Sequence, residues 1–197
     1  GLGDPVLNGK SYRIFPTQNP YRLRSGRVLA PVTLQSPGST DAPANVTGWL
    51  AWEKIDSVLY SDDLGKTWHL SPGAIQPGRS WAQWEPTVWE QSDGSVMMFA
   101  RNLDVRSLAD GGPASSQMLT WSVSHDGGTT WTAHAYVPLE TTSSRMHVVR
   151  ADAERWILIH NDYRGDTFQE GRQNLALFFK RGDGLDFVAG PGFTEPG

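Results

Sequence analysis

Short runs of apolar residues alternate with clusters of Gly, Pro, Asn, Asp and Ser along most of the chain. Several runs alternate apolar and polar positions, and others are continuously apolar over a short length. Both patterns are typical of β-strands bounded by turns. No segment shows the 3.6-residue period of an amphipathic helix. The pattern therefore predicts an all-β chain.

The expected strands fall into successive pairs separated by turn-rich loops. We expect them at residues 12–15, 23–32, 48–53, 57–60, 85–90, 95–101, 118–123, 134–139, 146–149, 156–160 and 174–180. The clearest hairpin signal is Asp93-Gly94 between two apolar runs, because this dipeptide favours the turn types that join antiparallel strands. Long Gly/Pro/Ser-rich loops are expected at 35–45, 71–80 and 108–116.

An eight-residue pattern, S-x-D-x-G-x-T-W, occurs at residues 61–68 and again at 124–131, 63 residues later (124 − 61). It suits a tight turn after a strand. Its Asp and Ser side chains accept bonds from backbone N–H groups two residues on, and its Gly supplies a positive φ. Its Trp packs back as an apolar plug with one N–H to satisfy. Residues 181–187 are a degenerate third copy, in which Asp183 follows Asp126 by 57 residues and Phe187 replaces the Trp.

This repeat resembles the Asp-box of sialidases and other Asp-box (BNR-repeat) β-propellers. The resemblance implies a β-propeller of four-stranded antiparallel blades, with each box at the blade periphery and away from the ligand. A period of 57–63 residues gives about three blades in 197 residues, of a six-bladed sialidase type. Propellers typically close with 4–8 blades. We therefore expect residues 1–197 to be a single domain that is an internal part of a larger propeller, or one completed by further polypeptide.

Sialidase-like enzymes also share a strand pattern with this chain. A Glu precedes an apolar strand, and an Asp-Gly turn leads into a second strand that ends in Arg; here these are Glu85 and Arg101. A later Arg before an N-L-x-L strand is matched by Arg172. The resemblance implies that Glu85 is the catalytic base that polarises a tyrosine nucleophile, and that Arg101 and Arg172 bind the substrate carboxylate. Guanidinium groups suit this task because they bind carboxylates bidentately and remain charged. A tyrosine nucleophile avoids setting a carboxylate against an anionic sugar.

Two family features are displaced or absent. Arg13, in Y-R-I-F-P, echoes the motif of the family's first arginine, but it lies only 72 residues before Glu85 (85 − 13) and a Phe interrupts the motif. No tyrosine follows Tyr163, although the nucleophile should come after Arg172. Either these parts lie outside residues 1–197, or the resemblance covers the fold without the hydrolase reaction.

A second group of residues fits another chemistry. His147, His160 and Tyr163 lie near several arginines in the sequence, Arg145 among them. In uronate lyases a His or Tyr abstracts the proton next to a carboxylate that Arg neutralises. A polysaccharide lyase acting on uronate-containing polymers is therefore one alternative, although both histidines also suit structural roles. A non-catalytic glycan-binding propeller is the other.

The amino-acid composition limits the classes of binding partner that we expect. The net charge is 17 − 21 = −4 without a basic run, which disfavours nucleic acid and anionic membrane surfaces. We expect a carbohydrate partner, no cofactor and no metal, since the chain has no cysteine and no His spacing of a ligand pair. Nine Trp residues suit blade packing or sugar stacking. The sequon at Asn45 is compatible with a secreted or extracellular protein.

Overall fold

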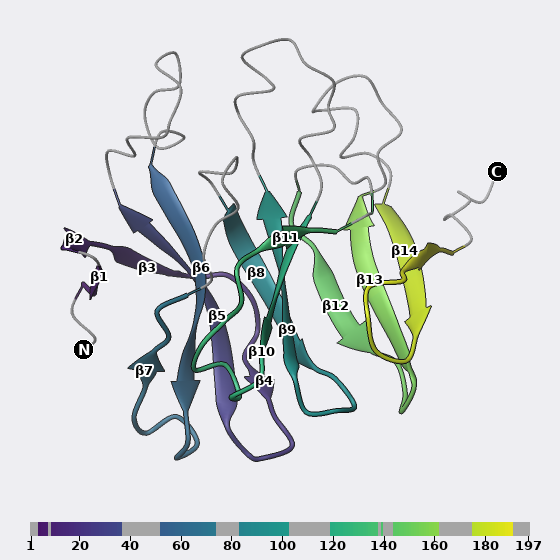
Figure 1. The fold of residues 1–197 in the computed structure, drawn as a ribbon, viewed down its shortest axis with the longest axis horizontal. Coiled ribbons are helices and arrows are strands. Elements are labelled where there is room, and N and C mark those ends of the chain that lie inside the picture. The colour runs from purple at the N-terminus through teal and green to yellow at the C-terminus, as the bar shows by residue number, and fades with distance from the viewer. Residues whose placement is uncertain are drawn as a thin grey trace, which may run out of the picture.

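The computed structural model describes residues 4–7, 9–36, 52–73, 83–102, 119–137, 139, 144–161 and 175–190. Regular structure in these segments is entirely β, which confirms the predicted class (Figure 1). This part of the chain contains no helix of the length and hydropathy that a membrane crossing requires.

Three antiparallel sheets stand side by side along the long axis of the molecule (Figure 1). The first sheet has the order β3 (Arg13–Pro16), β5 (Val28–Ser36), β6 (Glu53–Ser61), β7 (His69–Leu70), and β4 (Tyr21–Arg22) also pairs with β5. The second sheet has the order β8 (Gln83–Glu90), β9 (Val96–Asn102), β10 (Thr120–Ser124), β11 (Ala135–Tyr136). The third sheet contains β12 (His147–Arg150), β13 (Arg155–Asn161), β14 (Leu175–Arg181) and β15 (Val188–Ala189). A small hairpin of β1 (Val6–Leu7) and β2 (Lys10–Ser11) precedes them. The second and third sheets are four-stranded meanders, as in propeller blades, so the expectation of about three blades is confirmed.

The second sheet is buried on both faces. Side chains alternate between the faces of a strand, so Val96 and Met98 of β9 pack into a core shared with the first sheet. Met97 and Phe99 instead join the core shared with the third sheet. There the Phe99 ring lies edge-on to Trp89, with 4.8 Å between ring centroids. Continuous apolar character along β9 therefore reflects its place between two sheets.

The third sheet has one buried face and one apolar face that is partly exposed. Val149, Ile157, Phe179 and Val188 are successive cross-strand partners and form a row across all four strands. Val149 is 39% exposed and Val188 is 69% exposed. Rows of exposed apolar side chains on a sheet mark surfaces that pack against other polypeptide.

Both complete Asp-boxes form the predicted turns. The Asp63 carboxylate accepts bonds from the Thr67 N–H and hydroxyl, at 2.8 and 2.7 Å. Asp126 makes the same bonds with Thr130, at 2.8 and 2.6 Å. The box glycines have φ angles of 88° and 87°. We expected the box side chains to accept bonds from N–H groups two residues on. In each box the serine hydroxyl is 3.4 Å from that N–H, and its shorter bond, at 2.8 Å, comes from the glycine N–H four residues on. The turn is therefore wider than a two-residue bond would make it.

Box residues also tie neighbouring sheets together. The Arg27 guanidinium binds the Asp62 carboxylate of the first box at 2.7 Å and donates to the Thr129 hydroxyl of the second at 2.9 Å. In the degenerate third copy, Asp183 accepts a bond from the Ser92 N–H of the second sheet at 2.9 Å. Phe187 is 8% exposed there and packs as the expected plug. The boxes therefore link sheets as well as close turns.

The strand assignment was wrong in the first sheet. We expected separate strands at 48–53 and 57–60, but β6 runs unbroken from Glu53 to Ser61, and residues 48–51 lie outside the described segments. The polar residues Lys54 and Asp56, which lie between the two expected strands, are fully buried within β6. Lys54 donates to the Trp52 carbonyl at 3.0 Å, and its ammonium lies 4.8 Å from the centroid of the Trp84 ring. The expected strand at 134–139 is likewise shorter, at Ala135–Tyr136.

Candidate functional site

Glu85 sits at an irregularity in β8. The pairing register between β8 and β9 shifts between Trp84 and Thr87, and Glu85 has a φ of 58°. A non-glycine residue in this region costs on the order of 1–3 kcal/mol and persists where its surroundings hold it. Bulges of this kind redirect side chains and are common beside active sites. The backbone therefore marks Glu85 as a candidate functional residue.

Two buried threonines of the first sheet hold the bulge. The Thr33 hydroxyl oxygen accepts a bond from the Glu85 N–H at 2.9 Å. The Thr17 hydroxyl lies 3.4 Å from the Pro86 carbonyl and 3.2 Å from the Pro31 carbonyl. The first sheet thus satisfies backbone groups that the ladder between β8 and β9 leaves unpaired.

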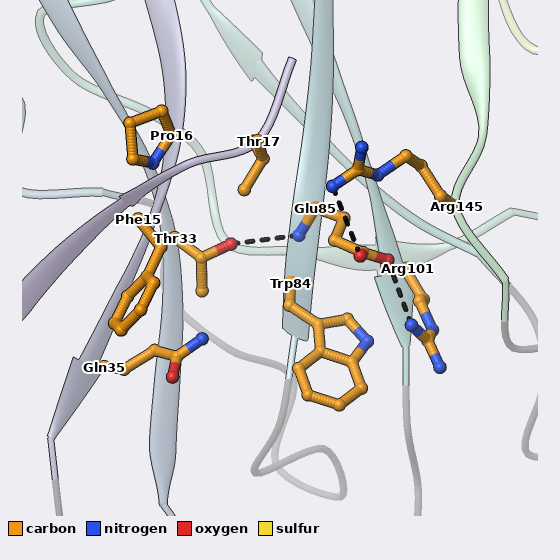
Figure 2. Close-up of a pocket in the computed structure, with 9 residues that line it drawn as sticks. All are labelled: Phe15, Pro16, Thr17, Thr33, Gln35, Trp84, Glu85, Arg101 and Arg145. Atoms are coloured by element: carbon orange, nitrogen blue, oxygen red, sulfur yellow. Dashed lines mark hydrogen bonds and ion pairs between the residues drawn. The ribbon is translucent and has the colours of Figure 1, made fainter.

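The Glu85 side chain lies between two guanidinium groups (Figure 2). Its Oε2 is 3.0 Å from Nη1 of Arg101, and its Oε1 is 3.5 Å from Nη2 of Arg145. The Arg101 guanidinium also lies 4.5 Å from the centroid of the Trp84 ring, which is a cation–π distance. One carboxylate facing two guanidiniums leaves a net charge of +1, which suits an anionic ligand.

These groups line a pocket of about 290 Å³ between the first sheet, β8, β9 and the segment before β12. Its lining residues are Phe15, Pro16, Thr17, Thr33, Gln35, Trp84, Glu85, Arg101 and Arg145 (Figure 2). The volume is near the lower end of the range for small-molecule sites. The pocket and the boxes occupy opposite ends of the second sheet, since Arg101 pairs with Trp84 at one end of β9 and Val96 pairs with Ser124 at the other. The box is thus remote from the pocket, as the resemblance implies.

A buried acid and a buried imidazole lie behind the pocket. Burial, followed by the nearby charge of Glu85, raises the pKa of Asp56 well above its usual value, and the Thr33 hydroxyl opposes this shift. His134 Nε2 is 3.9 Å from Asp56 Oδ2, and burial lowers the pKa of His134 to about 4. Burial therefore disfavours the charged form of both side chains behind Glu85.

The structure separates the two histidines of the lyase hypothesis. His147 pairs with Ile159 and therefore shares the outward face of the third sheet, whereas His160 faces the second sheet. His160 is 1% exposed, and its Nδ1 lies 3.1 Å from the Ser144 hydroxyl. Burial, with a contribution from the charge of Arg101, lowers the pKa of His160 to about 3. The imidazole is neutral but is covered by protein.

The remaining candidate residues lie either outside the described segments or away from the pocket. Arg172 and Tyr163 lie outside the described residues. Arg13 is at the start of β3, does not line the pocket, and has its guanidinium 5.5 Å from the centroid of the Trp52 ring. Sequence reasoning missed Thr33 and Trp84, and it assigned Arg145 to the lyase group. Within the described segments, no group of three or more His, Asp or Glu residues is arranged to hold a metal ion.

Blade-like sheets with Asp-box turns at one end and a Glu–Arg pocket at the other define a sialidase-like Asp-box β-propeller. The BNR repeat-like domain family matches residues 11–189, and the chain belongs to this family. Comparison with curated protein sequences gives no match.

Solved structures give the same fold at low sequence identity. NanB sialidase from Streptococcus pneumoniae is 20% identical, with a TM-score of 0.58 over 94% of this chain and 24% of that one. Trypanosoma rangeli sialidase in complex with sialic acid is 16% identical, with a TM-score of 0.57 over 88% and 25%. A protein of unknown function from Dyadobacter fermentans is 17% identical, with a TM-score of 0.58 over 89% and 51%. The chain thus spans about half of the last structure and about a quarter of the two sialidases.

Proposed function

We propose that this chain forms part of a sialidase-like glycoside hydrolase that acts on terminal anionic sugars of glycans. The observation that carries the proposal is the Glu85–Arg101 ion pair, set on a strained bulge and opening into a pocket. Family membership and the sialidase folds it resembles support the same activity.

Each residue has a distinct part in the proposed reaction. Arg101 and Arg172 bind the sugar carboxylate, and Glu85 polarises a tyrosine supplied from outside residues 1–197. A carboxylate that accepts the tyrosine proton makes the phenol a better nucleophile. The bulge and its two threonines hold Glu85 in place before substrate arrives, which lowers the cost of assembling the site.

Hydrolysis of a fluorogenic sialoside by the intact natural protein tests this proposal. We expect release of the fluorophore, and a fall in kcat of about 10²- to 10⁴-fold in a Glu85→Gln variant, the usual range for loss of a general base. Glu154→Gln is the matched control, because Glu154 is an exposed residue beside the β12–β13 turn. No hydrolysis by the natural protein, or equal activity of the two variants, would refute the proposal.

A non-catalytic glycan-binding propeller is the second candidate. It is favoured by the two guanidiniums that line the pocket, because they suit an anionic sugar whether or not a reaction follows. Binding to a glycan array without hydrolysis would support it. The uronate lyase is less well supported, because His160 is covered by protein and His147 lies on the opposite face of its sheet.

We also propose that a further four-stranded sheet covers the open face of the third sheet. This added sheet would bury the row from Val149 to Val188, in the same way that the third sheet buries one face of the second sheet. The 69% exposure of Val188 is the observation that supports this arrangement. A Val188→Asp substitution should weaken the contact with the added sheet, so that limited proteolysis cleaves the intact variant faster than the natural protein. Equal resistance of the two proteins to proteolysis would count against the proposed contact.

A further inference from the structure

We infer that Arg145 binds the anionic group of the sugar in the Glu85 pocket, an inference that rests on the proposed function. Arg145 belongs to neither strand pattern that singles out Glu85, Arg101 and Arg172. It reaches the pocket from the segment before β12, whereas Glu85 and Arg101 belong to strands of the second sheet (Figure 2).

The backbone on either side of Arg145 is fixed. The preceding Ser144 is 6% exposed, and its hydroxyl donates to Asn161 Oδ1 at 2.8 Å. The following Met146 is 1% exposed, and its carbonyl accepts a bond from Gln18 Nε2 at 2.8 Å. Arg145 is therefore presented to the pocket by an anchored segment, and binding through it requires little additional ordering of the backbone.

The two guanidiniums differ in how firmly Glu85 holds them. The Arg101 side chain is 11% exposed, lies 3.0 Å from the carboxylate and stacks on Trp84. The Arg145 side chain is 57% exposed, and its contact with the same carboxylate is 3.5 Å, at the outer limit of a hydrogen bond. A guanidinium carries five N–H donors. Glu85 thus holds Arg145 less firmly than it holds Arg101, and more of the Arg145 guanidinium is exposed to a ligand beside the carboxylate-binding Arg101.

Arg145 also sets the charge of the pocket wall. Among the described residues, the charged side chains that line the pocket are Glu85, Arg101 and Arg145, with a net charge of +1. Without Arg145 the wall would be neutral, and an entering carboxylate would meet Glu85 without a second compensating charge. Lys54 is buried beside Trp84 and does not line the pocket. Arg145 therefore supplies the second guanidinium charge of this part of the wall.

Binding of N-acetylneuraminic acid and of its methyl ester to the intact protein separates ligand contact from a structural role. The natural protein should prefer the acid, because only the acid presents a carboxylate. In Arg145→Ala this preference should fall about 10- to 100-fold, the range expected for a hydrogen bond to a charged group. Arg145→Lys should recover part of it, since Lys keeps the charge without the planar fork.

The matched control is Arg155→Ala, which removes an exposed arginine at the other end of the third sheet. It should leave the preference unchanged. An equal loss of acid and ester binding in Arg145→Ala, or an undiminished preference, would overturn the role of Arg145 and leave the proposed function standing. If the natural protein bound neither ligand, both this inference and the proposed function would fall.

Discussion

The strained backbone at Glu85 leads to a prediction about the order of two variants. Glu85→Ala and Glu85→Gly both remove the carboxylate, so the loss of the ion pair with Arg101 cancels when they are compared. Ala keeps a Cβ at a φ of 58°, where L-residues pay roughly 1–2 kcal/mol, and Gly does not. Gly normally destabilises a strand by roughly 0.5–1 kcal/mol relative to Ala. Subtraction predicts that Glu85→Gly is the more stable variant by about 0–1.5 kcal/mol.

Urea unfolding at equilibrium measures this difference in the free energy of unfolding. Ala30→Gly is the matched control, because Ala30 lies in the regular ladder of β5 opposite Leu59. It should lose about 0.5–1 kcal/mol, the ordinary penalty for Gly in a strand. If Glu85→Gly were less stable than Glu85→Ala by the same amount as this control, the claim that Glu85 is strained would be wrong.

Three further predictions concern stability. Arg27→Ala should lower the free energy of unfolding by about 1–3 kcal/mol, because two boxes lose their shared donor, whereas Arg155→Ala should change it by about 0.5 kcal/mol or less in the same urea titration. The pKa of His160 is about 3 in the folded protein, against a usual value of 6.5. Between about pH 3 and pH 6.5 the unfolded chain therefore binds a proton at His160 that the folded protein does not bind. Stability should therefore fall as the pH falls through this window, by up to about 1.4 kcal/mol per pH unit, and His160→Gln should flatten the measured profile. Bonds from the Thr67 N–H and hydroxyl lower the pKa of Asp63 to about 2, so its contribution should be present above pH 3.8 and be lost between pH 3.8 and about 2. An Asp63→Asn variant whose acid unfolding matched that of the natural protein would contradict this.

Much of the fold could be predicted because its signals are local. The Asp-box turns depend on residues within eight positions, and the hairpin at Asp93-Gly94 depends on two, so both appear in the sequence. The break expected in β6 was wrong because Lys54 and Asp56 are buried against Trp84 of the second sheet and His134 beside β11, respectively. Local polarity does not reveal such tertiary compensation.

The candidate site could be predicted only in part. Glu85 and Arg101 could be paired because they flank one hairpin and match a known pattern. Thr33 contributes through a bond between sheets, across 52 residues of sequence, and the positive φ of Glu85 has no local signature. His147 and His160 are close in sequence, but they lie on opposite faces of the third sheet because His147 pairs with Ile159 and successive residues of a strand point to opposite faces.

The most direct test of the account is a crystal structure of the protein with N-acetylneuraminic acid at saturating concentration. We predict that the sugar carboxylate lies within hydrogen-bond distance of the Arg101, Arg145 and Arg172 guanidiniums, with Glu85 beside the anomeric carbon. A sugar bound elsewhere, or an empty pocket at that concentration, would contradict it.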